Sequence, residues 1–421
     1  MDFKENNADC LNRIILHVDL DSFFATAAQQ ANPGLRKKPV GIVKAKGRSC
    51  IIAASKEAKK YGVKTGSNVF EAKKLCPSII LVSAEFEKYE DITYRFIEIC
   101  QKYSPICEVF SLDECFIDIT DTEKLWGNAL SIALDIQERL AGEIGDYLTC
   151  SVGISHNSLL AKLASTCAKP DGIFYLDQKS TFEALDKAAL TDVCGIGFGL
   201  YRRLVSLGIG DFKTLRTSSL KFLYKHFGPF WSEHLYNLAR GIDNSPVIPA
   251  EDIPEAKSVG RTYTTHRNLY KKEEIERLMR NLCEEASEKA RKMNLCGRYV
   301  GLALRGDEKS FYGHKTLKTY IDDGKMLFTI CQVIFENWTG KYIRFCGVTL
   351  SQLVKNEYRS MPLFPEDQQR KNLITAVDKI NDNFGTYTIF PGQLLKTEII
   401  RPEVTGYFGD KKFRPNFLRN S

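Results

Sequence analysis

Hydrophobic and polar residues alternate over residues 14–20, and this alternation predicts a β-strand near the start of the chain. Three aliphatic residues face one side of the strand and three polar residues face the other: Leu16, Val18 and Leu20 against His17, Asp19 and Asp21. A helical stretch follows from Ser22 to about Ala31, and the Asn-Pro-Gly sequence at 32–34 ends it. The chain therefore opens with a strand that carries two carboxylates on its polar face.

The patterns that follow predict a small basic insert and then an α+β layer. The insert combines two short strands within 39–53, around a run of basic residues, with helices at 55–61 and 68–75. The layer is expected to contain a strand at 79–83, a helix at 85–103, a strand–turn–strand passage at 108–120, a helix near 127–142 and a strand at 148–154. This order favours a mixed domain that is interrupted by the insert.

Two further units are predicted in the second half of the chain. Residues about 186–245 indicate a compact helical unit with glycine-rich turns, and the charged segment 249–257 indicates a linker. Residues 257–355 follow as strand, long helix, two strands, helix and strand. The long helix carries an apolar stripe with helical period, made of Ile275, Leu278, Met279, Leu282, Ala286 and Ala290.

Composition narrows the class of protein. With 421 residues, 43% of them hydrophobic, the chain can form two to four domains, and a net charge of +7 suits a polyanionic partner without establishing one. The 13 cysteines stand singly in apolar runs and the six histidines are scattered, so neither a disulfide scaffold nor a zinc site is expected. Neither a signal peptide nor a membrane-spanning run is visible, so a cytoplasmic protein is expected.

Two acidic motifs carry the candidate chemistry. Asp19 and Asp21 lie on one face of a strand, and the adjacent Asp113 and Glu114 lie between apolar runs. Carboxylates in such settings are costly unless they are solvated or bound to a cation. A divalent metal with oxygen ligands would remove the cost of both motifs, and two such ions can clamp the attacking and leaving oxygens of a phosphoryl displacement. A strand end that enters a turn and an exposed hairpin tip are the alternatives.

Three segments together resemble the motifs of Y-family DNA polymerases. They are His-Val-Asp-Leu-Asp-Ser-Phe-Phe-Ala at 17–25, Ser-Leu-Asp-Glu-Cys-Phe-Ile-Asp-Ile at 111–119, and the run from Gly-Ile-Ser-His-Asn to Ala-Lys-Pro-Asp-Gly at 153–172. The segments occur in the family's order and separation, and the resemblance covers nearly the whole chain. It is closest to the polymerase IV-like branch, with some features of the UmuC-like branch.

The resemblance implies an α+β, multidomain right-hand polymerase with a palm, small fingers, a helical thumb and an α/β little finger. The implied ranges are 1–30 and 77–185 for the palm, 31–76 for the fingers, 186–250 for the thumb, 257–355 for the little finger and 356–421 for a C-terminal tail. Such an enzyme would be a low-fidelity, DNA-directed translesion polymerase, working as a monomer on primer–template DNA and deoxynucleotides. No exonuclease motif is visible, so no proofreading is expected.

The same resemblance assigns the catalytic residues. Asp19, Asp113 and Glu114 would hold two Mg²⁺ ions, which Mn²⁺ could replace, and Leu20 would add a backbone carbonyl. The residues implied for the nucleotide are Phe23, Phe24, Ser55, Lys59 and Lys169. Phe24 would be the steric gate, because a flat aromatic ring under the sugar collides with a 2′-hydroxyl. The alternatives are a plain core aromatic for Phe24 and a solvated lysine at a helix end for Lys169.

One stretch of the insert departs from the polymerase IV-like pattern. That branch usually shows Tyr-Glu-Ala-Arg, whose tyrosine and arginine grip the phosphates, whereas this chain has Lys-Glu-Ala-Lys at 56–59. Lys59 can still offer charge to a phosphate, but as a point charge rather than a fork. The pattern gives Lys56 no assigned role.

Several residues are expected to contact DNA. The Val-Cys-Gly-Ile-Gly sequence at 193–197 resembles a helix–hairpin–helix, in which Gly195 and Gly197 would let backbone N–H groups approach a phosphate. A simple helix–helix turn is the alternative. Basic residues implied elsewhere are Arg48 near the templating base and Lys257, Arg261 and Arg267 on the little finger. A surface arginine and a solvated charged face are the alternatives for these.

The polar remainder, 356–421, is expected to be a tail with one helix at about 370–383. The Ser-Met-Pro-Leu-Phe sequence at 360–364 lies where bacterial relatives often carry a sliding-clamp peptide. Leu363 and Phe364 would fill an apolar pocket of the clamp, although the usual leading glutamine is absent.

Two rival functions stay open at this point. A non-catalytic accessory protein of damage tolerance could keep the fold and bind DNA, but the presence of all three acids argues against it. A different palm-fold enzyme, such as a nucleotide cyclase, would have no use for the helix–hairpin–helix or the little finger.

Overall fold

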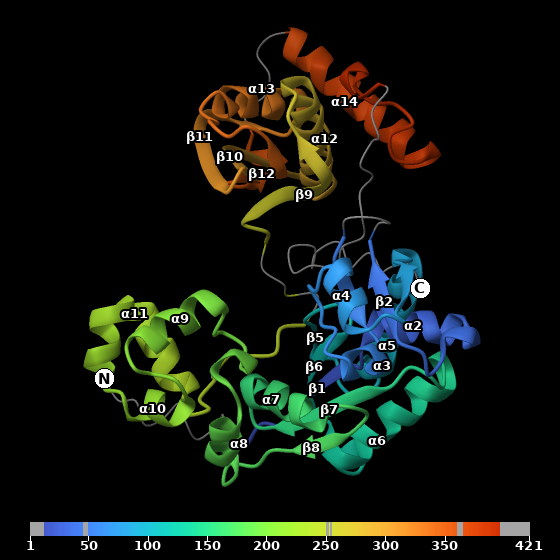
Figure 1. The fold of residues 1–421 in the computed structure, drawn as a ribbon, viewed down its shortest axis with the longest axis vertical. Coiled ribbons are helices and arrows are strands. Elements are labelled where there is room, and N and C mark those ends of the chain that lie inside the picture. The colour runs from blue at the N-terminus through green and yellow to red at the C-terminus, as the bar shows by residue number, and fades with distance from the viewer. Residues whose placement is uncertain (1–11, 45–48, 250–251, 253–254, 360–364, 396–421) are drawn as a thin grey trace. The chain divides into compact units, whose positions relative to one another are not determined.

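The computed structural model describes residues 12–44, 49–249, 252, 255–359 and 365–395 (Figure 1). Two compact units follow one another along the chain, with the change near residue 254. Within the described ranges, no helix has both the length and the apolar character to cross a membrane. Sheets and helices are mixed in both units, so the expected α+β class is confirmed.

A five-stranded sheet in the first unit carries the two acidic motifs. Its strands lie in the order β5-β6-β1-β7-β8, and every pair is antiparallel except β7 with β8. The strands are β1 (Ile15–Leu20), β5 (Cys107–Val109), β6 (Glu114–Asp118), β7 (Cys150–Ser155) and β8 (Ile173–Tyr175). The strand predicted from the opening alternation is therefore the central one.

Helices cover both faces of this sheet. The helices concerned are α2 (Phe23–Ala31), α5 (Phe86–Gln101), α6 (Ala129–Arg139) and α7 (Ser158–Ala168). α5 and α6 share a core with the aliphatic face of β1, whereas α7 packs on the other face. Gly153 on β7 permits this packing, because a Cβ atom there would lie 2.1 Å from the carbonyl oxygen of Ala161. The polar face of β1 is thus the one that α7 covers.

The basic insert forms a second, three-stranded sheet with the order β3-β2-β4. Its elements are β2 (Val40–Val43), β3 (Ile51–Ala54), α3 (Lys56–Lys60), α4 (Val69–Leu75) and β4 (Ile80–Ser83). β4 runs parallel to β2, with Ile80 opposite Val40. The sheet of the insert thus includes a strand beyond residue 76, because the chain crosses over through α3 and α4 before β4 completes the parallel pair.

A helical module completes the first unit, as the glycine-rich turns predict. Its helices are α8 (Thr181–Lys187), α9 (Phe198–Ser206), α10 (Phe212–Thr217) and α11 (Leu220–Leu238). They pack around a core that includes Leu204, Phe212 and Leu235. α11 bends at Gly228, where φ is 76°, just before Pro229.

The second unit confirms the predicted order of strand, long helix, two strands, helix and strand. Its elements are β9 (Ser258–Leu269), α12 (Lys272–Lys292), β10 (Leu295–Gly306), β11 (Lys309–Ile321), α13 (Gly324–Phe335), β12 (Ile343–Ser351) and β13 (Val354–Lys355). The sheet is antiparallel in the order β11-β10-β12-β9, with β13 paired to β10. α12 and α13 cover one face of it, and the predicted stripe of α12 is buried there (Figure 1).

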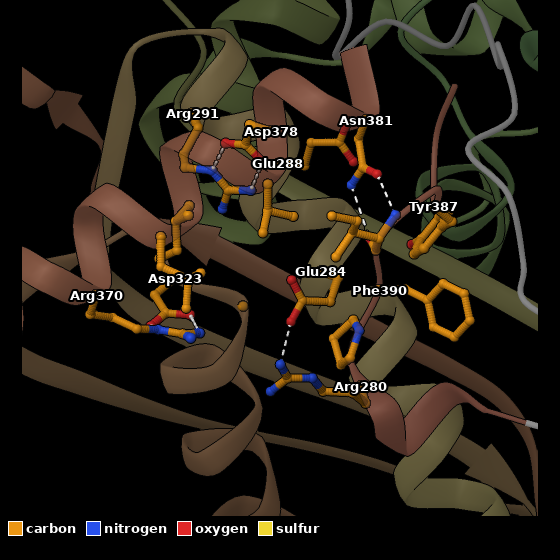
Figure 2. Close-up of a pocket in the computed structure, with 16 residues that line it drawn as sticks. Arg280, Glu284, Glu288, Arg291, Asp323, Arg370, Asp378, Asn381, Tyr387 and Phe390 are labelled. Atoms are coloured by element: carbon orange, nitrogen blue, oxygen red, sulfur yellow. Dashed lines mark hydrogen bonds and ion pairs between the residues drawn. The ribbon is translucent and has the colours of Figure 1, made fainter. Parts of the chain in front are cut away.

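Residues 365–395 of the predicted tail pack against α12 and the residues at the start of α13. Helix α14 (Pro365–Phe384) begins earlier than predicted and lies against α12 and the start of α13 (Figure 2). Arg291 forms a two-pronged ion pair with Asp378, at 2.6 and 2.7 Å, and Arg370 forms another with Asp323, at 2.8 and 2.9 Å. A cavity of about 290 Å³ remains between these elements. The partners are far apart in the chain, so no local pattern could indicate this docking.

Candidate active site

The two acidic motifs meet on neighbouring strands of the five-stranded sheet. Asp19, near the end of β1, lies directly opposite Glu114, which begins β6. The backbone N–H of Leu20 donates to the carbonyl oxygen of Asp113 at 2.8 Å. The structure therefore brings together Asp19, Leu20, Asp113 and Glu114, as the sequence predicted.

Burial raises the pKa of two of the three carboxyl groups. The Asp19 side chain is 14% exposed, and its burial raises its pKa to about 6, although Lys169 Nζ lies 2.8 Å from the carboxylate and opposes the change. Burial also raises the pKa of Asp113, and the neighbouring charge of Glu114 adds to the effect. A bound divalent cation would offset the cost of ionising Asp19 and Asp113, because its charge favours the ionised form of both carboxyl groups.

Glu114 has the opposite tendency. Burial alone would raise its pKa, but the hydrogen bond from His17 and the charge of Lys162 outweigh burial and lower the pKa to about 2. His17 is fully buried, and its Nε2 lies 3.1 Å from Glu114 Oε2. Burial lowers the pKa of His17 to about 4, so the neutral ring donates from Nε2 to the carboxylate and accepts at Nδ1 from the Ser165 hydroxyl, 2.6 Å away.

Sequence reasoning missed His17, Lys162 and Ser165 as members of the site. A signal for them existed, because His17 and Asp19 share the polar face of β1. Lys162, Ser165 and Lys169 are spaced by three and four residues, which places them on one side of α7 and its C-terminal end. These side chains come together because α7 packs over the polar face of β1.

The donor set suits a hard divalent cation, because carboxylate and carbonyl oxygens are the ligands that such ions prefer. Among the described residues, no group of acidic, histidine and cysteine side chains is already arranged as a metal shell. Each carboxylate is instead turned to a local partner: Asp19 to Lys169, Asp113 to Ser111, and Glu114 to His17 and Lys162.

Asp21 is not part of this group of acids. Its side chain is 3% exposed, and it accepts hydrogen bonds from the hydroxyls of Thr149 and Ser151, at 2.7 and 2.9 Å. The backbone N–H of Asp171 donates to it as well, at 2.8 Å. These donors compensate its burial, so no cation is needed to explain a carboxylate at this end of β1.

Three lysines surround Asp19 and Asp21. Lys169 pairs with Asp19, Lys56 lies 3.6 Å from Asp21, and Lys59 Nζ donates to the Ser22 hydroxyl at 2.8 Å. Burial lowers the pKa of Lys59, and the nearby positive charge of Lys169 lowers it further. A bound polyanion such as a triphosphate would relieve both effects.

The residues predicted to bind a nucleotide differ in their accessibility. The half-buried Phe24 ring stacks on Tyr89, with centroids 4.3 Å apart and planes inclined by 19°. The Phe23 side chain is 3% exposed and lies in the core, so only its backbone could meet a ligand. Ser55 is fully buried and caps α3 by accepting the N–H of Ala58, so the expected nucleotide contact of its side chain is not supported.

The two glycines of the predicted helix–hairpin–helix have different reasons to be glycine. Gly195 has φ of +109°, and a Cβ atom there would lie 2.7 Å from His234 Nε2. Gly197 is the N-cap residue of α9, and among the described atoms nothing lies within 4 Å of a Cβ placed on it. Fold geometry therefore explains Gly195, while Gly197 leaves its backbone open to a ligand.

The three basic residues of the second unit that were predicted to contact DNA differ in exposure and in their ion pairs. Lys257 is exposed. Arg261 is 15% exposed and faces Glu285 of α12 at 2.7 Å, which disfavours its expected contact with DNA. Arg267 is exposed but pairs with Glu274 at 2.8 Å. The predictions for Arg48, Leu363 and Phe364 fall outside the described residues.

Comparisons with known proteins agree on one family. The model of the impB/mucB/samB family matches residues 18–166, and that of the family's C-terminal domain matches residues 256–363. DNA polymerase IV of Desulfatibacillum aliphaticivorans is 33% identical over 91% of this chain and 97% of its own length. DNA polymerase IV 1 of Bacillus subtilis is 31% identical over 95% and 97%.

A solved structure supports the same grouping. The Y-family DNA polymerase chimera Dbh-Dpo4(243-245)-Dbh superposes with a TM-score of 0.71 at 25% identity, and covers 82% of this chain and 100% of its own. The similarity thus extends over both compact units.

Proposed function

Because the chain belongs to the impB/mucB/samB family, the Y-family DNA polymerases, we propose how its own residues carry out DNA synthesis. The protein is a DNA-directed DNA polymerase of the translesion type, with palm, fingers, thumb and little finger, and it acts on DNA and deoxynucleotides. Enzymes of this family depend on divalent metal ions. The observation that carries the proposal is the pairing of Asp19 with Glu114 beside the Leu20–Asp113 hydrogen bond.

Asp19, Asp113, Glu114 and the carbonyl oxygen of Leu20 are the proposed ligands of two Mg²⁺ ions, for which Mn²⁺ can substitute. When bound, such ions activate the primer 3′-hydroxyl and neutralise the charge that develops on the leaving pyrophosphate. The protein's own side chains hold the carboxylates ready. The hydrogen bond from His17 keeps Glu114 ionised, and the ammonium group of Lys169 stays beside Asp19 until the substrate binds.

The incoming nucleotide is bound by charge and by shape. Lys59 and Lys169 are the proposed triphosphate contacts, because Lys59 Nζ lies 2.8 Å from the Ser22 hydroxyl and Lys169 Nζ lies 2.8 Å from the Asp19 carboxylate, which places both ammonium groups at the end of β1. Phe24 is the proposed steric gate. Stacking on Tyr89 restricts the rotation of the Phe24 ring, so the ring would clash with the 2′-hydroxyl of a ribonucleotide.

The DNA duplex is held mainly through its backbone. The N–H groups near Gly195 and Gly197 contact phosphates, as do Lys257 and Arg267, and Arg48 packs near the templating base. Leu363 and Phe364 bind the sliding clamp in an otherwise monomeric, cytoplasmic enzyme. Calorimetry with a peptide of residues 358–366 tests the clamp contact, which is rejected if the cognate clamp does not bind the peptide.

Metal dependence tests the proposed site. Primer extension is followed over a range of Mg²⁺ concentrations, and electron paramagnetic resonance counts the Mn²⁺ ions bound to the protein–DNA–nucleotide complex. Glu114→Gln should raise the Mg²⁺ concentration for half-maximal extension by about tenfold or more and weaken Mn²⁺ binding. Unchanged extension and unchanged Mn²⁺ binding would remove Glu114 from the site.

A further inference from the structure

Lys56 starts helix α3, yet its ammonium group reaches the five-stranded sheet. Lys56 Nζ donates to the Thr149 hydroxyl at 2.8 Å and lies 3.6 Å from Asp21 Oδ2. The Lys56 side chain is 34% exposed, whereas that of Asp21 is 3% exposed. Lys56 is therefore not a free cation, but a contact between the small three-stranded sheet region and the central sheet.

The carboxylate that Lys56 approaches also holds the segment that carries Lys169. Asp21 accepts hydrogen bonds from the Thr149 hydroxyl, at 2.7 Å, and from the backbone N–H of Asp171, at 2.8 Å. Asp171 is two residues beyond Lys169, whose Nζ lies 2.8 Å from Asp19. One buried group thus connects Lys56 on α3 with the backbone that positions Lys169.

The helix that Lys56 begins also carries Lys59. The two lysines are three residues apart on α3, which is a single short helix, so they move together. Lys59 Nζ is placed 2.8 Å from the Ser22 hydroxyl, at the end of β1. Any change in how α3 is held against the sheet therefore changes the separation between Lys59 and Lys169.

We propose that Lys56 is a positioning residue. Together with Thr149 and Asp21 it forms a latch, the α3 latch, that fixes Lys59 relative to Lys169 and so sets the affinity for the triphosphate of the incoming nucleotide. The inference rests on the proposed role of Lys59 and Lys169 as triphosphate contacts. A lysine suits the latch, because its three N–H donors can serve a hydroxyl and a carboxylate at the same time.

The test compares Lys56→Met with Thr149→Val, which removes the hydroxyl of the latch and leaves every lysine in place. Single-turnover incorporation gives the dissociation constant of the nucleotide and the maximal rate. Fluorescence titration of a complex with a chain-terminated primer gives the nucleotide affinity without chemistry. Each substitution should weaken nucleotide binding by about tenfold, the effect expected for one charged hydrogen bond. Because both substitutions break the same contact, the double variant should bind the nucleotide about as tightly as the single variant with the larger loss.

Two control variants accompany these. Thr149→Ser restores the hydroxyl and should return nucleotide binding to the wild-type value. Lys60→Met removes an exposed lysine from the same helix and should leave binding unchanged. Lys56→Leu and Thr149→Ala remove the same contact and replace any variant that does not fold.

Three outcomes would overturn the latch. In the first, Lys56→Met weakens nucleotide binding while Thr149→Val does not, which means that Lys56 touches the phosphates directly. In the second, the two effects multiply in the double variant. In the third, both substitutions lower thermal stability and leave the nucleotide dissociation constant unchanged, which means that the contact is only structural.

Failure of the underlying assignment would look different. The proposed triphosphate site is refuted if the Lys59→Met and Lys169→Met variants bind the nucleotide as tightly as the wild type. This conclusion does not depend on the result for the latch variants.

Discussion

Asp19 and Glu114 lie opposite each other on neighbouring antiparallel strands, yet the structure drives their protonation in opposite directions. Burial raises the pKa of Asp19 to about 6, whereas the hydrogen bond from His17 and the charge of Lys162 overcome burial and lower that of Glu114 to about 2. Between these values one acid of the pair is protonated and the other is ionised. Above pH 6 both groups are ionised, and the ammonium groups of Lys169 and Lys162 then lie beside Asp19 and Glu114 respectively.

The first prediction follows from the raised pKa of Asp19. In the metal-free protein, Asp19→Asn should increase the free energy of unfolding at pH 7.5 by roughly 1–3 kcal/mol. The carboxyl group binds its proton more tightly when folded, with a pKa of about 6 against an ordinary 3.8, so its stabilising effect is complete below the ordinary value and lost as the pH rises through 6. Asparagine imitates the neutral form and removes that loss.

Urea unfolding in the presence of EDTA, at pH 7.5 and at pH 3.5, measures this effect. The gain should be present at the higher pH and nearly absent at the lower one, where the wild-type group is neutral in the folded protein. Asp121→Asn, at an exposed aspartate, is the matched control and should change nothing. A loss of stability at pH 7.5 would show that the ion pair with Lys169 outweighs the cost of burial.

A second prediction concerns sugar selection by Phe24. Phe24→Ala should reduce the preference for deoxynucleotides over ribonucleotides, expressed as a ratio of kcat/KM values, by about a hundredfold. Tyr89→Ala removes the ring that stacks on Phe24 and should give a smaller loss, whereas Tyr89→Phe keeps the stack and should behave as wild type. An unchanged ratio for Phe24→Ala would leave this residue as an ordinary core aromatic.

The thumb hairpin offers a pair of glycines for a third prediction. Gly195→Ala should destabilise the hairpin by about 1–3 kcal/mol, because its φ is +109° and the new methyl group would meet His234. Gly197→Ala should leave thermal stability unchanged but weaken duplex DNA binding, because the methyl group would separate the backbone from the phosphate. Thermal unfolding and fluorescence anisotropy with duplex DNA measure the two effects. Equal DNA affinity of Gly197→Ala and wild type would argue against a phosphate contact there.

A fourth prediction addresses the docked C-terminal helix. Asp378→Ala leaves the partly buried Arg291 without its carboxylate and should cost roughly 1–3 kcal/mol in the opening of α14. Asp382→Ala removes an exposed partner of Lys292 and should cost about 0–1 kcal/mol. Amide hydrogen exchange along α14 measures both. Equal protection in the two variants would mean that the helix is held by its apolar side chains alone.

Local patterns in the sequence predicted much of the fold and the acids of the site. The alternation around Asp19 and the helical stripe of α12 are local patterns, and both were confirmed. The nucleotide contact expected of Ser55 stays a prediction, because a serine before a helix serves equally well as a cap, which is the role that its side chain has in the structure. The pairing of β4 with β2 and the docking of α14 depend on contacts between distant residues, which no window of sequence contains.

The role of Lys56 shows the same limit within the site. Sequence comparison showed that a lysine stands where a tyrosine is usual, but not what the side chain contacts. Its partners are Asp21, which directly follows β1, and Thr149, which directly precedes β7. Only the folded arrangement shows that the ammonium group points at the sheet.

The central claim is that Asp19, Asp113 and Glu114 form the catalytic centre of a DNA polymerase. Single-nucleotide primer extension with Mg²⁺ tests it most directly, with the wild type beside an Asp113→Ala, Glu114→Ala double variant and with DNA binding measured on the same preparations. The wild type should extend the primer, and the double variant should lose more than about a thousandfold in rate while it still binds DNA. Extension by the double variant would contradict the assignment of the site, and a folded wild type that binds DNA without extending it would contradict the account of how this chain works.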